Sequence, residues 1–501
     1  MNFYQRVVSH RYFFLAASVS ILLTQLILSY YGNFRYNYDV APGDDVYNHL
    51  RYIETARRNP EFLPTPSYPP GFHYLVLGAS LLLNTTPSNI LLWGWPILLV
   101  LSSLAVMLLA KKVFGARVAL VTLALYALVS LQPLQTAYDG TLANLFAGNV
   151  IMPLALIALI NLWKDEGRLI WRNALLFALA AFLVAYSHHL SAIVLFGTFL
   201  LAGVARFGYL AVKSRFSDKK AVYWLGTIVG VGVLSVVGYL YLDVLSPLRS
   251  VVATAMHSVS PDRVWKLGYY VTRIGPLVAF FGFVGMALVV LGSIRGRFKF
   301  SNPTGLAVVS AWFALYFFGS LISAIGEPER LGRDWAMPGA IMAGAAVVMI
   351  FRYLKKRPEL LRLAAAAFAI FFAVGFLVKL DRLTSYNTMV RFSQADRTTM
   401  ELVRSGALPT PIYIWPKHPY WKIVVPDLIA SRTVRIVESF AEAKKVLRQK
   451  RGCLITGYNK PGTYPERLQN NSPLIRLMKV KGVTAHYLLE DKVKIWYILC
   501  D

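Results

Sequence analysis

The chain has 501 residues, 56% of them hydrophobic, and carries a formal net charge of +27 at pH 7. Its mean hydropathy of +0.51 is far above that of a soluble domain, and its apolar residues come in long uncharged runs, so we expect an integral membrane protein. The sequence has no Walker loop, glycine-rich dinucleotide motif or metalloprotease helix, which argues against a nucleotide cofactor.

About eleven apolar runs are long enough to cross the hydrocarbon as helices. They lie near 12–31, 89–110, 118–134, 143–163, 173–187, 190–208, 222–242, 275–293, 306–325, 336–352 and 363–379. A further apolar segment, 71–83, is short and follows Tyr68-Pro69-Pro70-Gly71. We expect it to form an interfacial or membrane-dipping helix instead of a span.

Basic residues are concentrated in the short loops on the N-terminal side of the predicted membrane, whereas the opposite loops carry acids and bases in similar numbers. The positive-inside rule therefore predicts a multi-pass protein of the cytoplasmic membrane with a cytoplasmic N-terminus. The loop 32–70 and the C-terminal domain would lie outside. There, the excess of positive charge fits anionic lipid headgroups or an anionic acceptor and not nucleic acid. The first span lacks a small-residue cleavage site, so we expect it to be retained.

The pattern changes from apolar helices to a mixture of α and β after residue 380. We therefore predict a transmembrane domain over 1–380 and a soluble mixed α/β domain over 381–501. In the second we expect helices at 392–405 and 439–450, and strands at 412–415, 422–425, 433–437, 453–457, 484–489 and 493–499, the last two antiparallel. Cys453 and Cys500 adjoin β-like runs, either as a disulfide or as two independent core residues.

The densest polar cluster of the membrane part follows the first span. Asp45 and His49 stand four residues apart, so a helix would bring a carboxylate and an imidazole onto one face. That arrangement suits metal ligation or general-base catalysis. The alternative is an N-cap aspartate before an amphipathic interfacial helix, a role that suits the neighbouring Asp44.

The later outer loops contribute further polar side chains. Asp139 is an isolated acid beside the membrane, either a functional carboxylate or the N-cap of the next span. Arg330 and Arg333 stand where the positive-inside rule disfavours them, and a guanidinium binds phosphate bidentately. The pair His188-His189 occupies another outer turn, either in the same site or as interfacial caps. A carboxylate cluster and an Arg/His cluster on one face favour a site for a lipid-borne phosphosugar.

With these residues in view, the chain resembles the GT-C superfamily of polytopic glycosyltransferases over most of residues 1–380. The resemblance is strongest to archaeal members related to oligosaccharyltransferase catalytic subunits and, more distantly, to protein O-mannosyltransferases. It rests on four motifs that occur in this order on one predicted membrane face: Asp44-Asp45 with His49, Tyr68-Pro69-Pro70-Gly71-Phe72-His73, Tyr138-Asp139-Gly140 and Glu329-Arg330.

The resemblance implies transfer of a sugar from a polyprenyl (dolichyl) phosphate-linked donor to an extracytoplasmic protein, lipid or glycan. The roles it implies are a catalytic group of Asp45, Asp44 and His49; a Mg²⁺ or Mn²⁺ site of Asp45, Asp139 and Glu329; and a donor-phosphate site of Arg330, Arg333, His188 and His189. A metal-free reaction that relies on one aspartate and basic residues is the alternative.

One oligosaccharyltransferase feature, the WWDYG signature, is absent. The nearest text, Trp415-Pro416-Lys417-His418-Pro419-Tyr420-Trp421, lacks the aspartate. Oligosaccharyltransferase-like transfer to protein is therefore the alternative function and not the main one. The rivals from other classes are an acceptor-binding scaffold and a lipid or sugar transporter, which would show inverted repeats and mid-bilayer polar residues.

Overall fold

The protein is described by a computed structural model. The structure describes residues 3–36, 38, 41–43, 45–58, 69–164, 169–241, 264–294, 302–322, 328–385, 398–399, 401–402, 405, 407–408, 411–414, 434–437, 440–448, 452–459, 485–490 and 494–500. The chain forms two compact units, the first comprising 1–32, 63–72 and 94–386 and the second 33–62, 73–93 and 387–501. The predicted strand at 422–425, most of the predicted helix at 392–405, and Asp44 lie outside the described residues.

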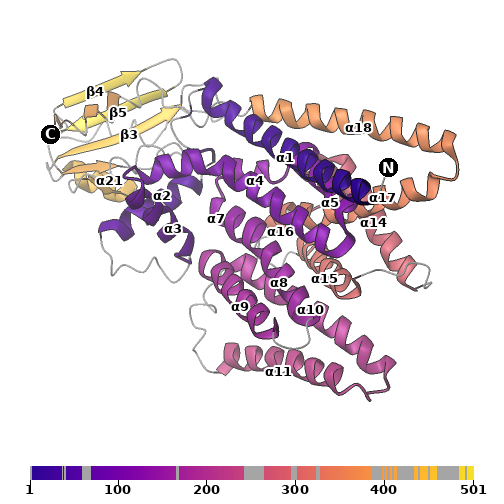
Figure 1. Cartoon of the computed structure of the whole chain (residues 1–501). Coiled ribbons are helices and arrows are strands. Elements are labelled where there is room, and N and C mark those ends of the chain that lie inside the picture. Colours follow the sequence, from indigo (N-terminus) through magenta and orange to yellow (C-terminus); the bar gives the residue numbers. More distant parts are fainter. Residues whose placement is uncertain are drawn as a thin grey trace. The chain divides into compact units, whose positions relative to one another are not determined.

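The first unit is built from helices whose length and composition suit a bilayer (Figure 1). The long helices of the chain are α1 (Phe3–Tyr36), α4 (Pro87–Phe114), α8 (Met152–Lys164), α9 (Leu169–Ser187), α10 (His189–Lys213), α11 (Lys219–Tyr241), α14 (Pro276–Ile294), α15 (Pro303–Ser320), α17 (Ala336–Leu354) and α18 (Pro358–Ser385). The shorter helices α5 (Ala116–Ala124), α6 (Leu134–Tyr138), α7 (Leu142–Asn144), α13 (Leu267–Tyr269) and α16 (Pro328–Asp334) connect or extend them.

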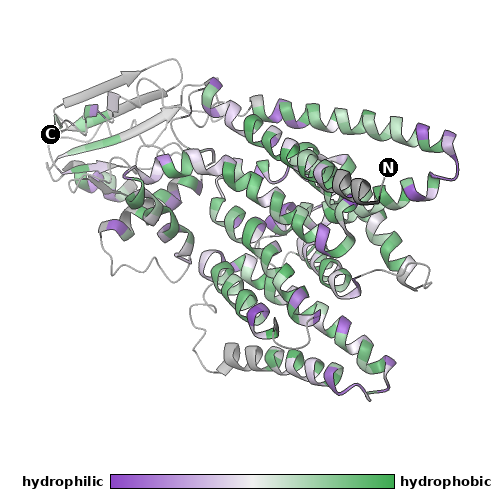
Figure 2. Ribbon diagram, viewed as in Figure 1, coloured by the Kyte–Doolittle hydropathy of each residue, from purple (hydrophilic) through white to green (hydrophobic). Residues whose placement is uncertain are grey.

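Within the described part of the chain, nine helical stretches are long and apolar enough to cross a membrane. They coincide with nine of the predicted spans, and the other two predicted spans coincide with α11 and α14. Figure 2 shows hydrophobic residues along most of the length of α18, with hydrophilic residues near its ends. The prediction of a polytopic helical membrane protein is therefore confirmed.

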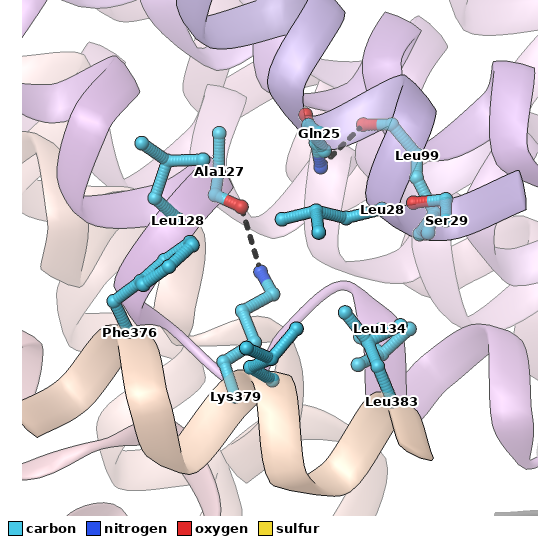
Figure 3. Close-up of a pocket in the computed structure, with 11 residues that line it drawn as sticks. Gln25, Leu28, Ser29, Leu99, Ala127, Leu128, Leu134, Phe376, Lys379 and Leu383 are labelled. Atoms are coloured by element: carbon cyan, nitrogen blue, oxygen red, sulfur yellow. Dashed lines mark hydrogen bonds between the residues drawn. The ribbon is translucent and has the colours of Figure 1, made fainter. Parts of the chain in front are cut away.

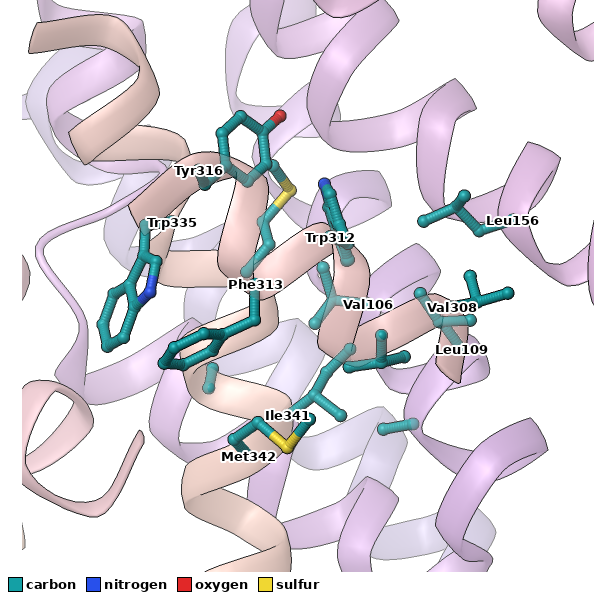
Figure 4. Packing of buried hydrophobic residues seen from close by; sticks show 14 of the residues in the cluster. Val106, Leu109, Leu156, Val308, Trp312, Phe313, Tyr316, Trp335, Ile341 and Met342 are labelled. Carbon is teal, nitrogen blue, oxygen red and sulfur yellow. The ribbon is translucent and has the colours of Figure 1, made fainter. Parts of the chain in front are cut away.

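Large aromatic side chains fill the centre of the first unit. Trp312, Tyr316 and Trp335 are almost fully buried, and Figure 4 shows them among aliphatic side chains of neighbouring helices. The ring of Trp335 stacks on Phe283 at 4.9 Å between ring centroids and meets Tyr270 edge-on at 5.0 Å. Because Trp335 directly follows α16, this packing fixes the short helix that carries Arg333.

Helices α14 and α17 approach closely at small residues. A Cβ atom on Gly285 would collide with the backbone carbonyl of Met342, and one on Gly282 would lie 2.9 Å from the ring of Trp335. Small residues of this kind let membrane helices bring their backbones together.

Among the described residues of the first unit, three stretches are π-helical: η1 (Leu125–Val129), η2 (Leu145–Ile151) and η4 (Tyr270–Ile274). Such turns leave the normal backbone hydrogen-bond pattern and are frequent at functional sites. Here η1 ends α5, η2 follows α7, and η4 precedes α14.

The second unit contains α2 (Asp45–Arg58), α3 (Gly71–Leu82, whose first two residues belong to the first unit) and a five-stranded sheet with α21 (Phe440–Arg448). The strands are β1 (Ile412–Ile414), β2 (Val434–Ile436), β3 (Cys453–Asn459), β4 (Ala485–Glu490) and β5 (Lys494–Cys500), in the order β2-β1-β3-β5-β4. The first three are parallel to one another, and β5 is antiparallel to both its neighbours. The predicted strands that fall on described residues are confirmed, as is the helix at 439–450.

The two cysteines lie directly opposite each other in the β3–β5 ladder. Cys453 is disulfide-bonded, and Cys500 is the only other cysteine of the chain. Of the two alternatives left open by the sequence, the structure thus has the disulfide.

Candidate functional site

A polar cavity of about 370 Å³ opens in the first unit where α6, η4, α16 and the end of α18 meet. Its walls combine two acids, two arginines and neutral side chains: Leu131, Leu134, Gln135, Tyr138, Asp139, Thr272, Arg273, Glu329 and Arg382. Asp139 and Glu329, both predicted from sequence as site residues, therefore line one cavity.

Both carboxylates at the cavity are paired with arginines. The Nη1 atom of Arg273 donates to Oε1 of Glu329 at 2.7 Å, and its guanidinium also lies 4.9 Å from the centroid of the Tyr269 ring. Arg333 forms an ion pair with Asp139. Arg333 is largely buried, whereas Asp139, Arg273 and Glu329 are each about one-third exposed. The cavity lining thus contains two carboxylates, Asp139 and Glu329, and two guanidinium groups, Arg273 and Arg382.

The local sequence explains how these side chains are presented. Asp139 ends the single turn of α6, and Gly140 follows with a positive φ of 77°, a conformation that glycine adopts without strain. Thr141, not Asp139, precedes α7 as its N-terminal residue, so the carboxylate is directed to Arg333 and not to a helix end. Arg273 lies in η4, the π-helical turn before α14.

Tyr270, in the same turn, fixes η4 against the neighbouring helix. Burial raises the pKa of its hydroxyl to about 12, and the hydrogen bond with Ser320 opposes that shift. The hydroxyl therefore stays protonated and can hold this turn against the end of α15.

A buried polar network lies beside the ion pair of Arg333. Asn144 donates to Asp334 at 3.0 Å, Ser191 donates to Asn144 at 3.0 Å, and Nδ1 of His188 lies 2.9 Å from the Ser191 hydroxyl. All four side chains are almost fully buried. These hydrogen bonds connect α7, the start of α10 and α16.

The two histidines and Arg330 belong to the same region. The rings of His188 and His189 are stacked at 5.5 Å, and the charge of Arg330 acts on both His189 and Asp334. His188 also caps α10 by accepting from the Ser191 amide, as the alternative reading of this pair supposed. The predicted Arg/His cluster is therefore brought together, although neither Arg330 nor Arg333 is among the residues that line the cavity.

The arginines that do line it, Arg273 and Arg382, were missed by the sequence reasoning. Both carried a usable signal. Arg273 directly precedes a predicted span on the side where basic residues are disfavoured, and Arg382 directly follows the last one.

Asp45 and His49 lie in the second unit. Asp45 is the first residue of α2 and accepts a hydrogen bond of 3.3 Å from Asn48. His49 is 3% exposed, and its Nδ1 lies 2.9 Å from Nε2 of His73 on α3, with Tyr52 packed edge-on against His73. His73 was quoted in a sequence motif, but its pairing with His49 was not foreseen.

The predicted metal site can be tested against these positions. Asp139 and Glu329 are each paired with an arginine, and the described residues include no group of three or more His, Cys, Asp or Glu suited to a metal ion. The donor set seen in the cavity therefore does not fit Mg²⁺ or Mn²⁺, and we derive no reaction step through a metal.

No protein-family model and no curated protein sequence matches the chain. Solved structures do. The oligosaccharyltransferase AglB from Archaeoglobus fulgidus, in complex with an inhibitory peptide and a dolichol-phosphate, superposes with a TM-score of 0.59 at 16% identity, covering 87% of this chain and 69% of that one. ArnT from Cupriavidus metallidurans, bound to undecaprenyl phosphate, gives 0.57 at 14% identity and covers 98% of both chains.

The similarity to these structures establishes the fold. The chain has the GT-C glycosyltransferase fold. The resemblance inferred from four short motifs is thus confirmed at the level of fold. A further structure of the Archaeoglobus enzyme, at TM-score 0.53 and 17% identity and covering 81% of this chain and 61% of that one, is a complex with Zn and sulfate, so a metal ion does bind a protein of this fold.

Proposed function

We propose that this protein is a membrane glycosyltransferase that moves a sugar from a polyprenyl-phosphate donor to an acceptor outside the cytoplasmic membrane. The observation that carries the proposal is the cavity of the GT-C fold in which Arg273 and Arg382 stand beside Asp139 and Glu329. Guanidinium groups are suited to a phosphate, and the carboxylates of the same cavity to sugar hydroxyls.

In this proposal the donor phosphate enters the cavity and takes hydrogen bonds from Arg273 and Arg382. Glu329 already occupies one face of Arg273, so the phosphate has to compete with it. The stacking on Tyr269 keeps the guanidinium in place during that exchange. Arg333, which is paired with Asp139, and Arg330 would add positive charge near the leaving phosphate as the sugar bond breaks.

An acceptor alcohol needs a base, and Asp45 remains our proposal for that role. Asp45 is the first residue of α2, and an aspartate is a side chain that can take a proton from an acceptor alcohol. The buried pair of His49 and His73 braces the turn of α2 that follows Asp45 against α3. Asp44 remains the proposed capping neighbour.

The disulfide supports the proposed orientation. Disulfides persist in oxidising compartments outside the cytoplasm, and Cys453 is bonded within the C-terminal domain. An extracytoplasmic C-terminal domain agrees with the positive-inside rule applied to the loops.

Transfer of a single sugar is favoured over oligosaccharyltransferase-like transfer. The WWDYG signature is absent from the sequence, and the nearest segment, 415–421, lacks the aspartate.

The test is donor binding by purified Arg382→Ala protein. Removal of a charged hydrogen bond to phosphate should weaken binding of undecaprenyl phosphate about 10- to 100-fold. Arg362→Ala is the matched control, because Arg362 lies exposed on the same helix α18 outside the cavity lining, and it should bind like the wild type. If both variants bind undecaprenyl phosphate with equal affinity, this cavity is not the donor site.

A further inference from the structure

Lys379 is a buried lysine within the membrane-spanning helix α18. Its side chain is 6% exposed and lies among apolar residues, including Leu128, Leu134 and Phe376 (Figure 3). Charged side chains are costly inside a bilayer and usually have a function there. None of the roles described above uses Lys379.

Its ammonium group donates to the backbone carbonyl of Ala127 at 2.8 Å (Figure 3). Ala127 lies in η1, at the end of α5. The amides that would continue this helix are used elsewhere, since Leu131 N donates to the Ile274 carbonyl and Gln132 N to the Ser130 hydroxyl. Carbonyls at a helix C-terminus are left without helical partners and carry partial negative charge, so a cation is stabilising there.

The space around Lys379 is too small for a substrate group. The void lined by Lys379 and Gln25 measures about 10 Å³, room for one water molecule at most. A phosphate therefore cannot reach Lys379 directly, and any effect of this residue on the donor acts through its neighbours.

Two residues near Lys379, Leu134 and Arg382, also line the polar cavity. Leu134, the first residue of α6, lines both the small void and the cavity. Arg382, one helical turn beyond Lys379 on α18, lines the cavity too. The bond between Lys379 and Ala127 thus ties α18 to the end of η1 just before the chain continues into α6, which carries Gln135 and leads into Asp139.

We propose that Lys379 is a positioning residue for the donor site: by capping the end of α5 and η1, it holds α18 so that Arg382 faces the same cavity as α6. This inference rests on the proposed function of the cavity. A cap that served stability alone would leave donor recognition unchanged in any variant that folds.

Three variants of the full-length protein test this. Lys379→Met keeps the length but removes the charge and the donor, and it should raise the donor KM about 10- to 100-fold with a much smaller change in kcat. Lys379→Arg keeps a cation and should restore most of the affinity. Gln25→Leu, a change in the same void at a residue not bonded to η1, is the control and should leave the donor KM unchanged. If Lys379→Met does not fold, Lys379→Gln, whose amide falls short of the carbonyl, takes its place with the same expectation.

The decisive comparison adds Arg382→Ala. If Lys379 acts through Arg382, Lys379→Met should have no further effect on donor binding in the Arg382→Ala background. If the two substitutions weaken donor binding additively, Lys379 does not act through Arg382 and the inference is wrong. A wild-type donor KM in a folded Lys379→Met protein would also overturn it. Both outcomes would leave the cavity as the donor site. Unchanged binding in Arg382→Ala alone would overturn the proposed donor site and this inference with it.

Discussion

At the scale of single residues, the ion pair between Arg273 and Glu329 determines how the cavity can receive an anion. Both side chains are about one-third exposed, so water screens the pair and its contribution is modest, roughly 0–1 kcal/mol. A phosphate that binds both Arg273 and Arg382 can therefore displace Glu329 at small cost. The carboxylate then becomes free to contact the sugar.

Replacing Glu329 should accordingly help binding and harm turnover. Glu329→Gln removes the charge that competes for Arg273, so the affinity for undecaprenyl phosphate should rise by up to about fivefold. Turnover should fall, because the sugar loses a carboxylate. Isothermal titration and a transfer assay measure the two effects, with Glu359→Gln on the exposed start of α18 as the control. Weaker phosphate binding in Glu329→Gln would mean that the pair orients Arg273 for the donor instead of blocking it.

Asp45 should be the residue whose charge the reaction needs most. Asp45→Asn preserves size but removes the base, and loss of general-base catalysis costs about 10²- to 10⁴-fold in rate. The change at the first turn of α2 should cost stability only about 0.3–1 kcal/mol. Initial rates of sugar transfer measure it, with Asp44→Asn expected to lose less. An active Asp45→Asn beside an inactive Asp44→Asn would reverse the assignment within the pair.

At the scale of elements, the spans were predictable because one physical quantity sets them. A helix that crosses about 30 Å of hydrocarbon needs about 20 apolar residues, so length and hydropathy alone located α1, α4, α10 and the other spans. The pairing of Asp139 with Arg333 and of His49 with His73 was not predictable, because these residues are far apart in the chain and only the folded arrangement brings them together. Asp45 and His49 both lie on α2, as expected, and the contact of His49 with His73 was not foreseen.

The π-helical turns were missed for a similar reason. Neither η1 nor η4 has a distinctive composition, and both depend on tertiary contacts such as Lys379 with Ala127 and Tyr270 with Ser320. The acids of the cavity could be identified from sequence because an isolated carboxylate beside a membrane is unusual. Its arginines, Arg273 and Arg382, adjoin predicted spans on the side where basic residues are disfavoured, a signal that the sequence analysis did not use.

The contact between α14 and α17 gives a prediction about stability. Gly285→Val would drive a side chain into the backbone at Met342, and overpacking of this kind costs about 1–3 kcal/mol. Thermal unfolding in detergent should show a lower Tm. Gly208→Val on α10, where the space is open, is the control and should change little. Equal stability of the two variants would mean that α14 and α17 do not pack at Gly285.

At the scale of the whole molecule, the proposed function requires that the site faces the outside of the cytoplasmic membrane. The charge distribution predicts that residues 32–70 and 380–501 are outside and that 111–117, 206–220 and 352–362 are inside. A cysteine introduced at Ser472 should react with an impermeant thiol reagent in intact cells, and one at Lys219 should react only after the membrane is opened. The reverse pattern would invert the orientation and put the proposed site in the cytoplasm.

Sugar transfer from a lipid-linked phosphate can be measured with the purified protein. Purified protein in liposomes is incubated with labelled polyprenyl-phosphate sugars and an extract of extracytoplasmic acceptors. We expect the label to move to an acceptor with release of an equal amount of polyprenyl phosphate, and we expect this transfer to be lost in the double variant of Asp45→Asn and Arg382→Ala. Donor that crosses the bilayer intact, or no donor consumed from any of these lipids, would contradict the proposed function.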